Sequence, residues 1–129
     1  MIIKLLYSIQ LIVCVFKIMS IKICYLKKLN IKTSANVVLF TDDKFNISSL
    51  KKHLSKSEFS YIFDLLKNSD LKKDLLFFEI NSKKTVFLVS IKKDIKISDI
   101  ENLGAKFHNY INYDKKKEYF VNSDTISNK

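Results

Sequence analysis

The stretch TVFLVSI, residues 85–91, is the feature that most constrains how this chain can fold. Its apolar residues follow one another instead of alternating with polar ones. A strand with one face in water alternates with a period of two, whereas a nearly continuous apolar strand is buried on both faces. The sequence therefore predicts a sheet with helices on each side.

Three further stretches are expected to join this strand. DLLFFEI (74–80) precedes it across the short polar link 81–84, which is the spacing of a hairpin. ANVVLFTDD (35–43) is an apolar run closed by a polar turn, and EYFVNSD (118–124) indicates a strand that returns in parallel. With 129 residues, 47% of them hydrophobic, the chain can bury one core. We expect a single α/β domain whose mixed sheet is flanked by helices.

A first helix is predicted from about residue 48 to residue 68. Ser48 or Ser49 can cap it by accepting hydrogen bonds from the free amides of the first turn. The apolar residues fall near the three-and-four spacing of a helix that packs on a sheet. The expected core positions are Leu50, Leu54, Tyr61, Ile62, Leu65 and Leu66.

A second helix is predicted to begin at the sequence Ser98-Asp-Ile-Glu101, which fits a capping box. Its expected core stripe is Ile100, Leu103, Phe107 and Ile111. Gly104, the only glycine of the chain, lies inside this helix at a cost of about 1 kcal/mol relative to alanine. A close approach of the helix to the sheet would explain it.

The first 18 residues pose a separate question. The apolar run 5–16, LLYSIQLIVCVF, is shorter than the roughly 20 residues of a membrane-spanning helix, and no small-residue cleavage site follows it. From Met19 onward Ile21, Ile23 and Tyr25 alternate with less apolar residues, as in a strand. We expect residues 1–18 to be an upstream extension from a start codon assigned too early. An uncleaved apolar anchor is the rival interpretation.

The formal net charge of +10 raises the possibility of a nucleic-acid or other polyanion partner. All 23 basic residues are lysines, so the planar arginine fork that binds phosphates bidentately is missing. The lysines are also spread along the chain with acidic residues nearby. An AT-rich genome favours lysine, asparagine, isoleucine and phenylalanine codons, and we take this as the main origin of the charge. A lysine-rich α/β module that binds a polyanion remains the alternative function.

Nucleotide-binding and histidine-dependent chemistry find little support in the sequence. A phosphate-binding loop needs several glycines so that backbone amides can approach the phosphate, and the single glycine lies within a predicted helix. His53 and His108 have no partner at metal-ligand spacing. Both are interpreted as solvated or half-buried surface histidines.

Other candidate residues also have simpler interpretations. Asp42 and Asp43 could form a metal or acid-base pair, but they follow a strand and precede Asn46, which favours a turn. Cys14 and Cys24 form no CxxC motif and are expected to be ordinary thiols. We therefore predict no catalytic, cofactor-binding or metal-binding residue in this chain.

The order of these elements resembles the N-terminal domain of the cytosol (leucyl) aminopeptidase family. The resemblance covers roughly residues 19–126 and is carried by IKTSANVVLFTDD, a Leu- and Lys-rich helix, LLFFEI, KTVFLVSIKK, SDIENLGAKFHNYI and EYFVNSD. Met19-Ser-Ile-Lys22 is similar to the short strand that opens the family, which favours a start at Met19. The family's glycine turn after the valine-rich strand is replaced here by Ser90–Lys93.

The resemblance implies a macro-domain-like α/β layer that precedes a separate catalytic domain. In that family the catalytic domain binds two divalent ions, zinc or manganese, which activate water for removal of N-terminal residues from peptides. No stretch here matches the family's metal-binding signature, which is similar to NTDAEGRL. The chain is thus expected to be a truncated, non-catalytic domain with an assembly or regulatory role, in which residues 127–129 begin a linker. The implied setting is a cytoplasmic homo-hexamer, with neither membrane nor nucleic acid as partner.

Overall fold

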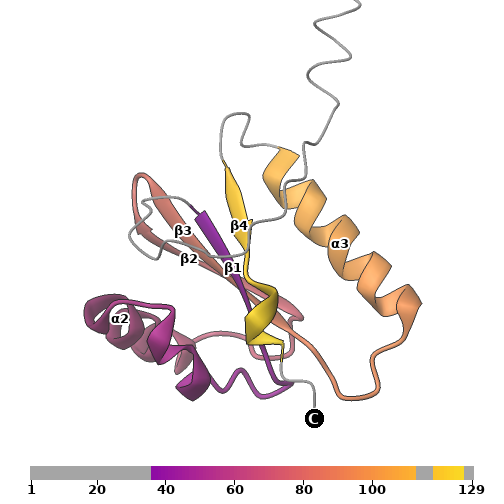
Figure 1. The fold of residues 1–129 in the computed structure, drawn as a ribbon, viewed down its shortest axis with the longest axis horizontal. Helices are drawn as coiled ribbons and strands as arrows, with labels where there is room; N and C mark the ends of the chain where they lie inside the picture. Colours follow the sequence, from indigo (N-terminus) through magenta and orange to yellow (C-terminus); the bar gives the residue numbers. More distant parts are fainter. Residues whose placement is uncertain (1–35, 113–117, 127–129) are drawn as a thin grey trace, which may run out of the picture.

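Residues 36–112 and 118–126 are described in this computed structural model, and Figure 1 shows how their elements are arranged. Four strands form one mixed sheet in the order β2-β3-β1-β4, and the two α-helices lie on opposite sides of it. This confirms the predicted α/β domain with a helix-flanked mixed sheet. The elements are β1 (Asn36–Thr41), η1 (Ser48–Lys52), α2 (Lys56–Leu66), β2 (Leu75–Asn81), β3 (Lys84–Ser90), α3 (Ile97–Asn112), β4 (Tyr119–Val121) and η2 (Ser123–Thr125), where η is a 3₁₀ helix.

Several predictions fall on other parts of the chain. The extension 1–18, the strand around residues 21–25 and the linker 127–129 all lie outside the described residues. The structure therefore tests only the domain predictions that concern residues from Asn36 onward.

The centre of the sheet consists of β1 and β3, which pair in parallel. Thr85–Ser90 of β3 are all buried, which confirms that this strand is covered on both faces. β1 is also paired on both sides, because β4 runs parallel to it along its other edge. The predicted parallel return of the last strand is thus confirmed, although β4 is shorter than expected and ends at Val121.

The hairpin between β2 and β3 is confirmed as antiparallel. At its turn the Asn81 side chain accepts a hydrogen bond from the Lys83 amide at 2.8 Å. This contact is the Asx-type turn chemistry that asparagine supplies at such positions. The sequence could predict the hairpin because its turn chemistry is local.

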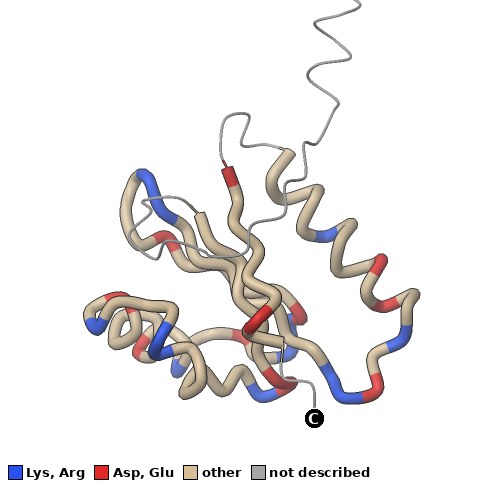
Figure 2. The backbone as a smooth tube through the Cα atoms, viewed as in Figure 1, with Lys and Arg blue, Asp and Glu red and all other residues tan. Residues whose placement is uncertain are grey.

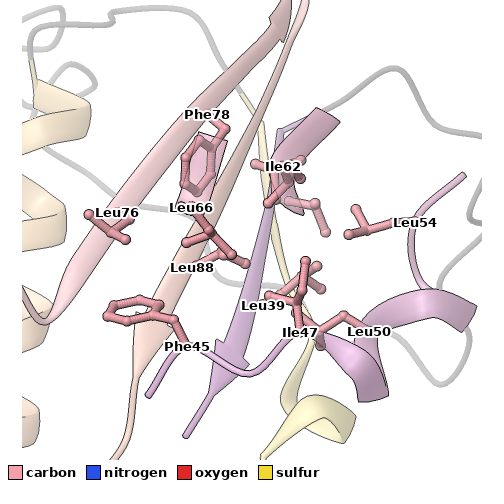
Figure 3. Close-up of a cluster of buried hydrophobic side chains, with 12 residues drawn as sticks. Leu39, Phe45, Ile47, Leu50, Leu54, Ile62, Leu66, Leu76, Phe78 and Leu88 are labelled. Carbon is pink, nitrogen blue, oxygen red and sulfur yellow. The ribbon is translucent and has the colours of Figure 1, made fainter. Parts of the chain in front are cut away.

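Two hydrophobic cores lie on the two faces of the sheet. The first packs α2, η1 and the loop before η1 against one face, and Figure 3 shows its leucine, isoleucine and phenylalanine side chains converging. The second, under α3, is largely aromatic: the Phe87 ring meets those of Phe107 at 5.3 Å and Tyr110 at 5.1 Å, both edge to face. Alternate residues of β1 and β3 supply the two cores, since successive side chains of a strand point to opposite faces.

The first predicted helix begins later than expected. Ser48 and Ser49 lie in η1, whereas α2 is capped by Ser55, whose hydroxyl accepts from the Glu58 amide while the Glu58 carboxylate accepts from the Ser55 amide. Four expected core residues, Leu50, Leu54, Ile62 and Leu66, are buried, and Leu65 is partly buried. Tyr61 is exposed, so its predicted core role was wrong.

The second helix also differs from its prediction at the N-terminus. α3 begins at Ile97, which places Ser98 inside the helix, and the Asp99 carboxylate accepts from the Lys96 amide at 3.3 Å. The predicted box between Ser98 and Glu101 was therefore wrong by two residues. Asp99 satisfies a free amide at the start of the helix, as the predicted capping box would have done. The local pattern therefore indicated the right kind of cap but the wrong residues.

The core face of α3 is shifted relative to the predicted stripe. Leu103, Phe107 and the unpredicted Tyr110 pack on the sheet, whereas Ile100 is exposed. A side chain added at Gly104 would meet nothing within 4 Å, so the expected close approach of helix and sheet at this position was wrong.

One ion pair ties α2 to the hairpin. Lys84 Nζ lies 2.7 Å from Glu58 Oε1, and the two side chains are only 11% and 15% exposed. Burial raises the pKa of Glu58, but the hydrogen bonds from Lys84 and Ser55 outweigh it and leave the pKa below its ordinary value. The ionised Glu58 therefore serves both the helix cap and the contact with β3.

We predict that Ser55→Ala lowers the free energy of unfolding by about 1 kcal/mol, because the capping hydrogen bond to the Glu58 amide is lost. Ser49→Ala is the matched control, and we expect it to change stability by less than about 0.5 kcal/mol. Urea unfolding followed by circular dichroism measures both. A larger loss for Ser49→Ala would show that the helix is capped where the sequence pattern first placed its start.

Candidate functional site

The acidic residues Asp42 and Asp43, which follow β1, lie in a turn. Asp42 Oδ1 accepts hydrogen bonds from the amides of Lys44 at 3.1 Å and Asn46 at 2.8 Å, and Asp43 is exposed. Asn46 in turn accepts from the Ser48 amide at 3.0 Å. These contacts agree with the interpretation of Asp42 and Asp43 as turn residues and solvated charge.

Phe45 lies at the centre of this turn in an unusual backbone conformation. Its φ of 54° is in the left-handed region, which non-glycine residues seldom adopt and which costs of the order of 1–3 kcal/mol. The ring is buried in the first core, where its burial offsets that cost. The Asp42 carboxylate, which binds the amides on both sides of Phe45, holds the chain in this conformation.

A hollow of about 220 Å³ lies between this turn and α2. Its apolar walls include Phe45, Phe63 and Leu71, and the cations at its rim are Lys44 and Lys67. The Lys67 ammonium is already paired with Asp64 at 2.9 Å. A pocket that binds a small ligand specifically combines apolar walls with several converging polar groups, and this hollow offers few.

His53 sits where η1 meets the C-terminal segment of the domain. Its Nδ1 lies 3.1 Å from Nδ2 of Asn122, although the two residues are 69 positions apart in the sequence. Its Nε2 is buried and makes no hydrogen bond within the described part of the chain. Burial lowers the pKa of His53, the nearby charge of Lys52 lowers it further, and Asp124 acts in the opposite direction.

Asn122 connects this histidine to the sheet. Its backbone amide donates to the Val38 carbonyl of β1 at 3.0 Å, and its side-chain oxygen accepts from the Asp124 amide at 3.1 Å. Sequence reasoning missed this junction. The Asn-Ser-Asp pattern indicates the local cap of η2. Nothing in the sequence indicates that His53, at the end of η1, contacts Asn122.

The two histidines are thus in different environments. His53 is half-buried, whereas His108 is exposed on α3, and both agree with the prediction of surface or half-buried histidines. Within residues 36–112 and 118–126, no group of three or more His, Cys, Asp or Glu side chains could hold a metal ion. Cys14 and Cys24 lie outside these ranges.

The charge of the described residues is close to balanced. Residues 36–112 and 118–126 contain 13 lysines and 12 acidic residues, a net charge of +1 against +10 for the whole chain. Figure 2 shows the two signs interspersed along the backbone. Most of the excess positive charge therefore belongs to other segments of the chain, and the described surface has no dominant basic character of its own.

Apolar side chains are exposed at the β4 edge of the sheet. Val121 is 57% exposed, and it pairs with Val38, whose side chain belongs to the core under α3. Ile97 and Ile100, at the beginning of α3, are 77% and 53% exposed. We call Ile97, Ile100 and Val121 the α3-face surface, because α3 and the Val121 side chain lie on the same side of the sheet.

Comparison with known proteins leaves the family open. No protein-family model, no curated protein and no solved structure matches the chain. In the described segments, neither α-helix has the length and hydrophobicity needed to cross a bilayer.

We predict that Asp42→Ala lowers the free energy of unfolding by about 1–2 kcal/mol, because two amides lose their acceptor and the Phe45 conformation loses its support. Asp42→Asn keeps a side-chain oxygen and should lose less. Asp43→Ala should change stability by under about 0.5 kcal/mol. Urea unfolding with and without Mn²⁺ measures these effects. Equal losses at both positions, together with stabilisation of the wild type by Mn²⁺, would favour a metal pair.

Proposed function

We propose that this chain is a non-catalytic α/β module similar to the N-terminal domain of leucyl aminopeptidase-like metallopeptidases, and that it acts by docking onto a catalytic domain. The module would contribute to assembly or regulation of a cytoplasmic, homo-hexameric enzyme. The catalytic domain would supply the two divalent ions, zinc or manganese, and the residues that bind them. This proposal combines the resemblance of residues 19–126 with one structural observation.

That observation is the α3-face surface. Large apolar side chains that are exposed together on one side of a domain typically mark a contact with another protein surface. Val121 and Ile100 are more than half exposed although their neighbours Val38 and Leu103 belong to the core under α3. We take the apolar face of a catalytic domain as the occupant of this surface.

The lysine-rich alternative has less support from the described residues. Their net charge of +1 provides little attraction for a polyanion, and a binding site for one would depend on the lysines elsewhere in the chain. A polyanion-binding function is therefore the expected alternative if the docking proposal fails.

The proposal predicts what the genome encodes after the codon for Lys129. Sequencing the locus should reveal an in-frame or frameshifted continuation that encodes a domain rich in Asp, Glu and Lys metal ligands. A stop codon followed by unrelated sequence, with no such domain encoded nearby, would contradict it. Binding of the full chain to duplex DNA over a range of salt concentrations would then test the polyanion alternative.

Docking predicts a further effect of substitution at the α3-face surface. The double variant Ile97→Ser, Ile100→Ser should weaken association with the encoded catalytic domain by tenfold or more, because it removes two exposed apolar contacts. Tyr61→Ser is the control, since Tyr61 is 47% exposed but lies on α2, against the opposite face of the sheet. Isothermal titration calorimetry measures both. Equal affinities for the two variants would exclude this surface as the docking site.

A further inference from the structure

We propose that His53 is the latch of a pH-sensitive strap: the neutral imidazole holds residues 119–125 against η1 and β1, and protonation of the ring releases them. The strap consists of β4, Asn122 and η2. This inference concerns a conformational change within the domain, and it holds whether or not the domain docks onto a catalytic partner.

The hydrogen bonds of Asn122 determine which nitrogen of His53 carries the proton. The Asn122 side-chain oxygen is engaged by the Asp124 amide, so its Nδ2 group faces the imidazole. An amide nitrogen can only donate, and His53 Nδ1 must therefore be an unprotonated acceptor. The neutral ring consequently carries its proton on the buried Nε2.

Protonation is incompatible with this arrangement. An imidazolium has a proton on both nitrogens, so its Nδ1 proton would point at the two protons of Asn122 Nδ2. Rotation of the Asn122 amide would present its oxygen to His53, but it would break the bond to the Asp124 amide. The buried Nε2 would also have to carry part of the new charge without a hydrogen bond from the described residues.

The charged groups around His53 come from both elements that meet there. Lys52, on its own element, disfavours a second positive charge, and Asp124, from η2, favours it. Burial of the ring adds to the effect of Lys52, so the pKa of His53 falls below its ordinary value of 6.5. The imidazole regains its ordinary tendency to bind a proton once the strap has moved away.

Besides the latch, the strap is held by backbone pairing, hydrogen bonds and packing, including the Tyr119 ring, which meets Phe87 at 5.7 Å and Phe107 at 5.5 Å. β4 pairs with β1 over only three residues, the Asn122 amide donates to Val38, and the Thr125 hydroxyl accepts from the Phe40 amide at 2.8 Å. The Phe120 side chain is partly buried and packs against the first core. Release would expose the edge of β1, and the amides of Phe40 and Asn122 would then exchange with solvent.

The sign of the pH dependence follows from the lowered pKa. The open state binds more protons than the closed state, so closure is favoured above pH 6.5 and weakens as the pH falls. The opening equilibrium should therefore rise as the pH falls from 7.5 to 5.5, by at most about tenfold for one group with an open-state pKa of 6.5.

Hydrogen exchange of the full chain, resolved by NMR and corrected for intrinsic rates, tests this proposal. Protection of the Phe40 and Asn122 amides should fall from pH 7.5 to pH 5.5, by up to about tenfold, as the linkage of one proton allows. Protection of Leu88, in the centre of the sheet, should fall much less. The imidazole signals of His53 should titrate with a pKa below its ordinary value of 6.5. Unchanged protection of Phe40 and Asn122 would overturn the proposal.

Two variants separate the latch from general acid sensitivity. The variant His53→Asn offers a side-chain oxygen in place of Nδ1 and cannot titrate, so the strap should stay closed at both pH values. The control variant His108→Asn should retain the wild-type pH response. Asn122→Asp places a carboxylate against the imidazole, so its strap should close more tightly at pH 5.5 than at pH 7.5. An unchanged response in both His53→Asn and Asn122→Asp would assign the pH dependence to other groups and refute the latch.

Discussion

Both faces of β3 are buried, and this requirement governs the position of every other described element. A strand whose side chains are apolar on both sides needs cover above and below, because its exposed area would otherwise cost about 25 cal/mol per Å². α2 and η1 cover one face, and α3 covers the other. Phe87 and Leu88 lie next to each other in the sequence yet belong to different cores, which links the two layers through a single strand.

The two cores hold their elements differently. The α2 side consists mainly of aliphatic side chains with the buried Phe45 and Phe78, and a partly buried ion pair between Lys84 and Glu58 adds to its stability. The α3 side relies on aromatic rings gathered around Phe87, and α3 itself has no fully buried residue. The helix with the less complete cover, α3, is thus the one whose beginning carries the exposed Ile97 and Ile100.

The features with functional interest lie around the last part of the described chain. β4 is short, its Val121 is exposed, and the segment that follows is attached to β1 by hydrogen bonds from the Asn122 amide to the Val38 carbonyl and from the Phe40 amide to the Thr125 hydroxyl. A firmly packed centre and a lightly attached edge strand are compatible in one domain, because local stability varies with the number of contacts. The proposed docking surface and the proposed latch both depend on this difference.

The sequence by itself determined the strands, the hairpin and the mixed sheet, because runs such as TVFLVSI and the turn at Asn81 express their preferences locally. It placed the helix starts wrongly, since Ser49 and Ser55 are equally good caps in isolation and only packing against the sheet selects Ser55. The exposure of Ile100 and Tyr61 was also decided by tertiary structure, through the rotation of each helix on the sheet. The contact between His53 and Asn122 joins residues 69 positions apart, and only the fold, which brings η1 beside the end of β4, could create it.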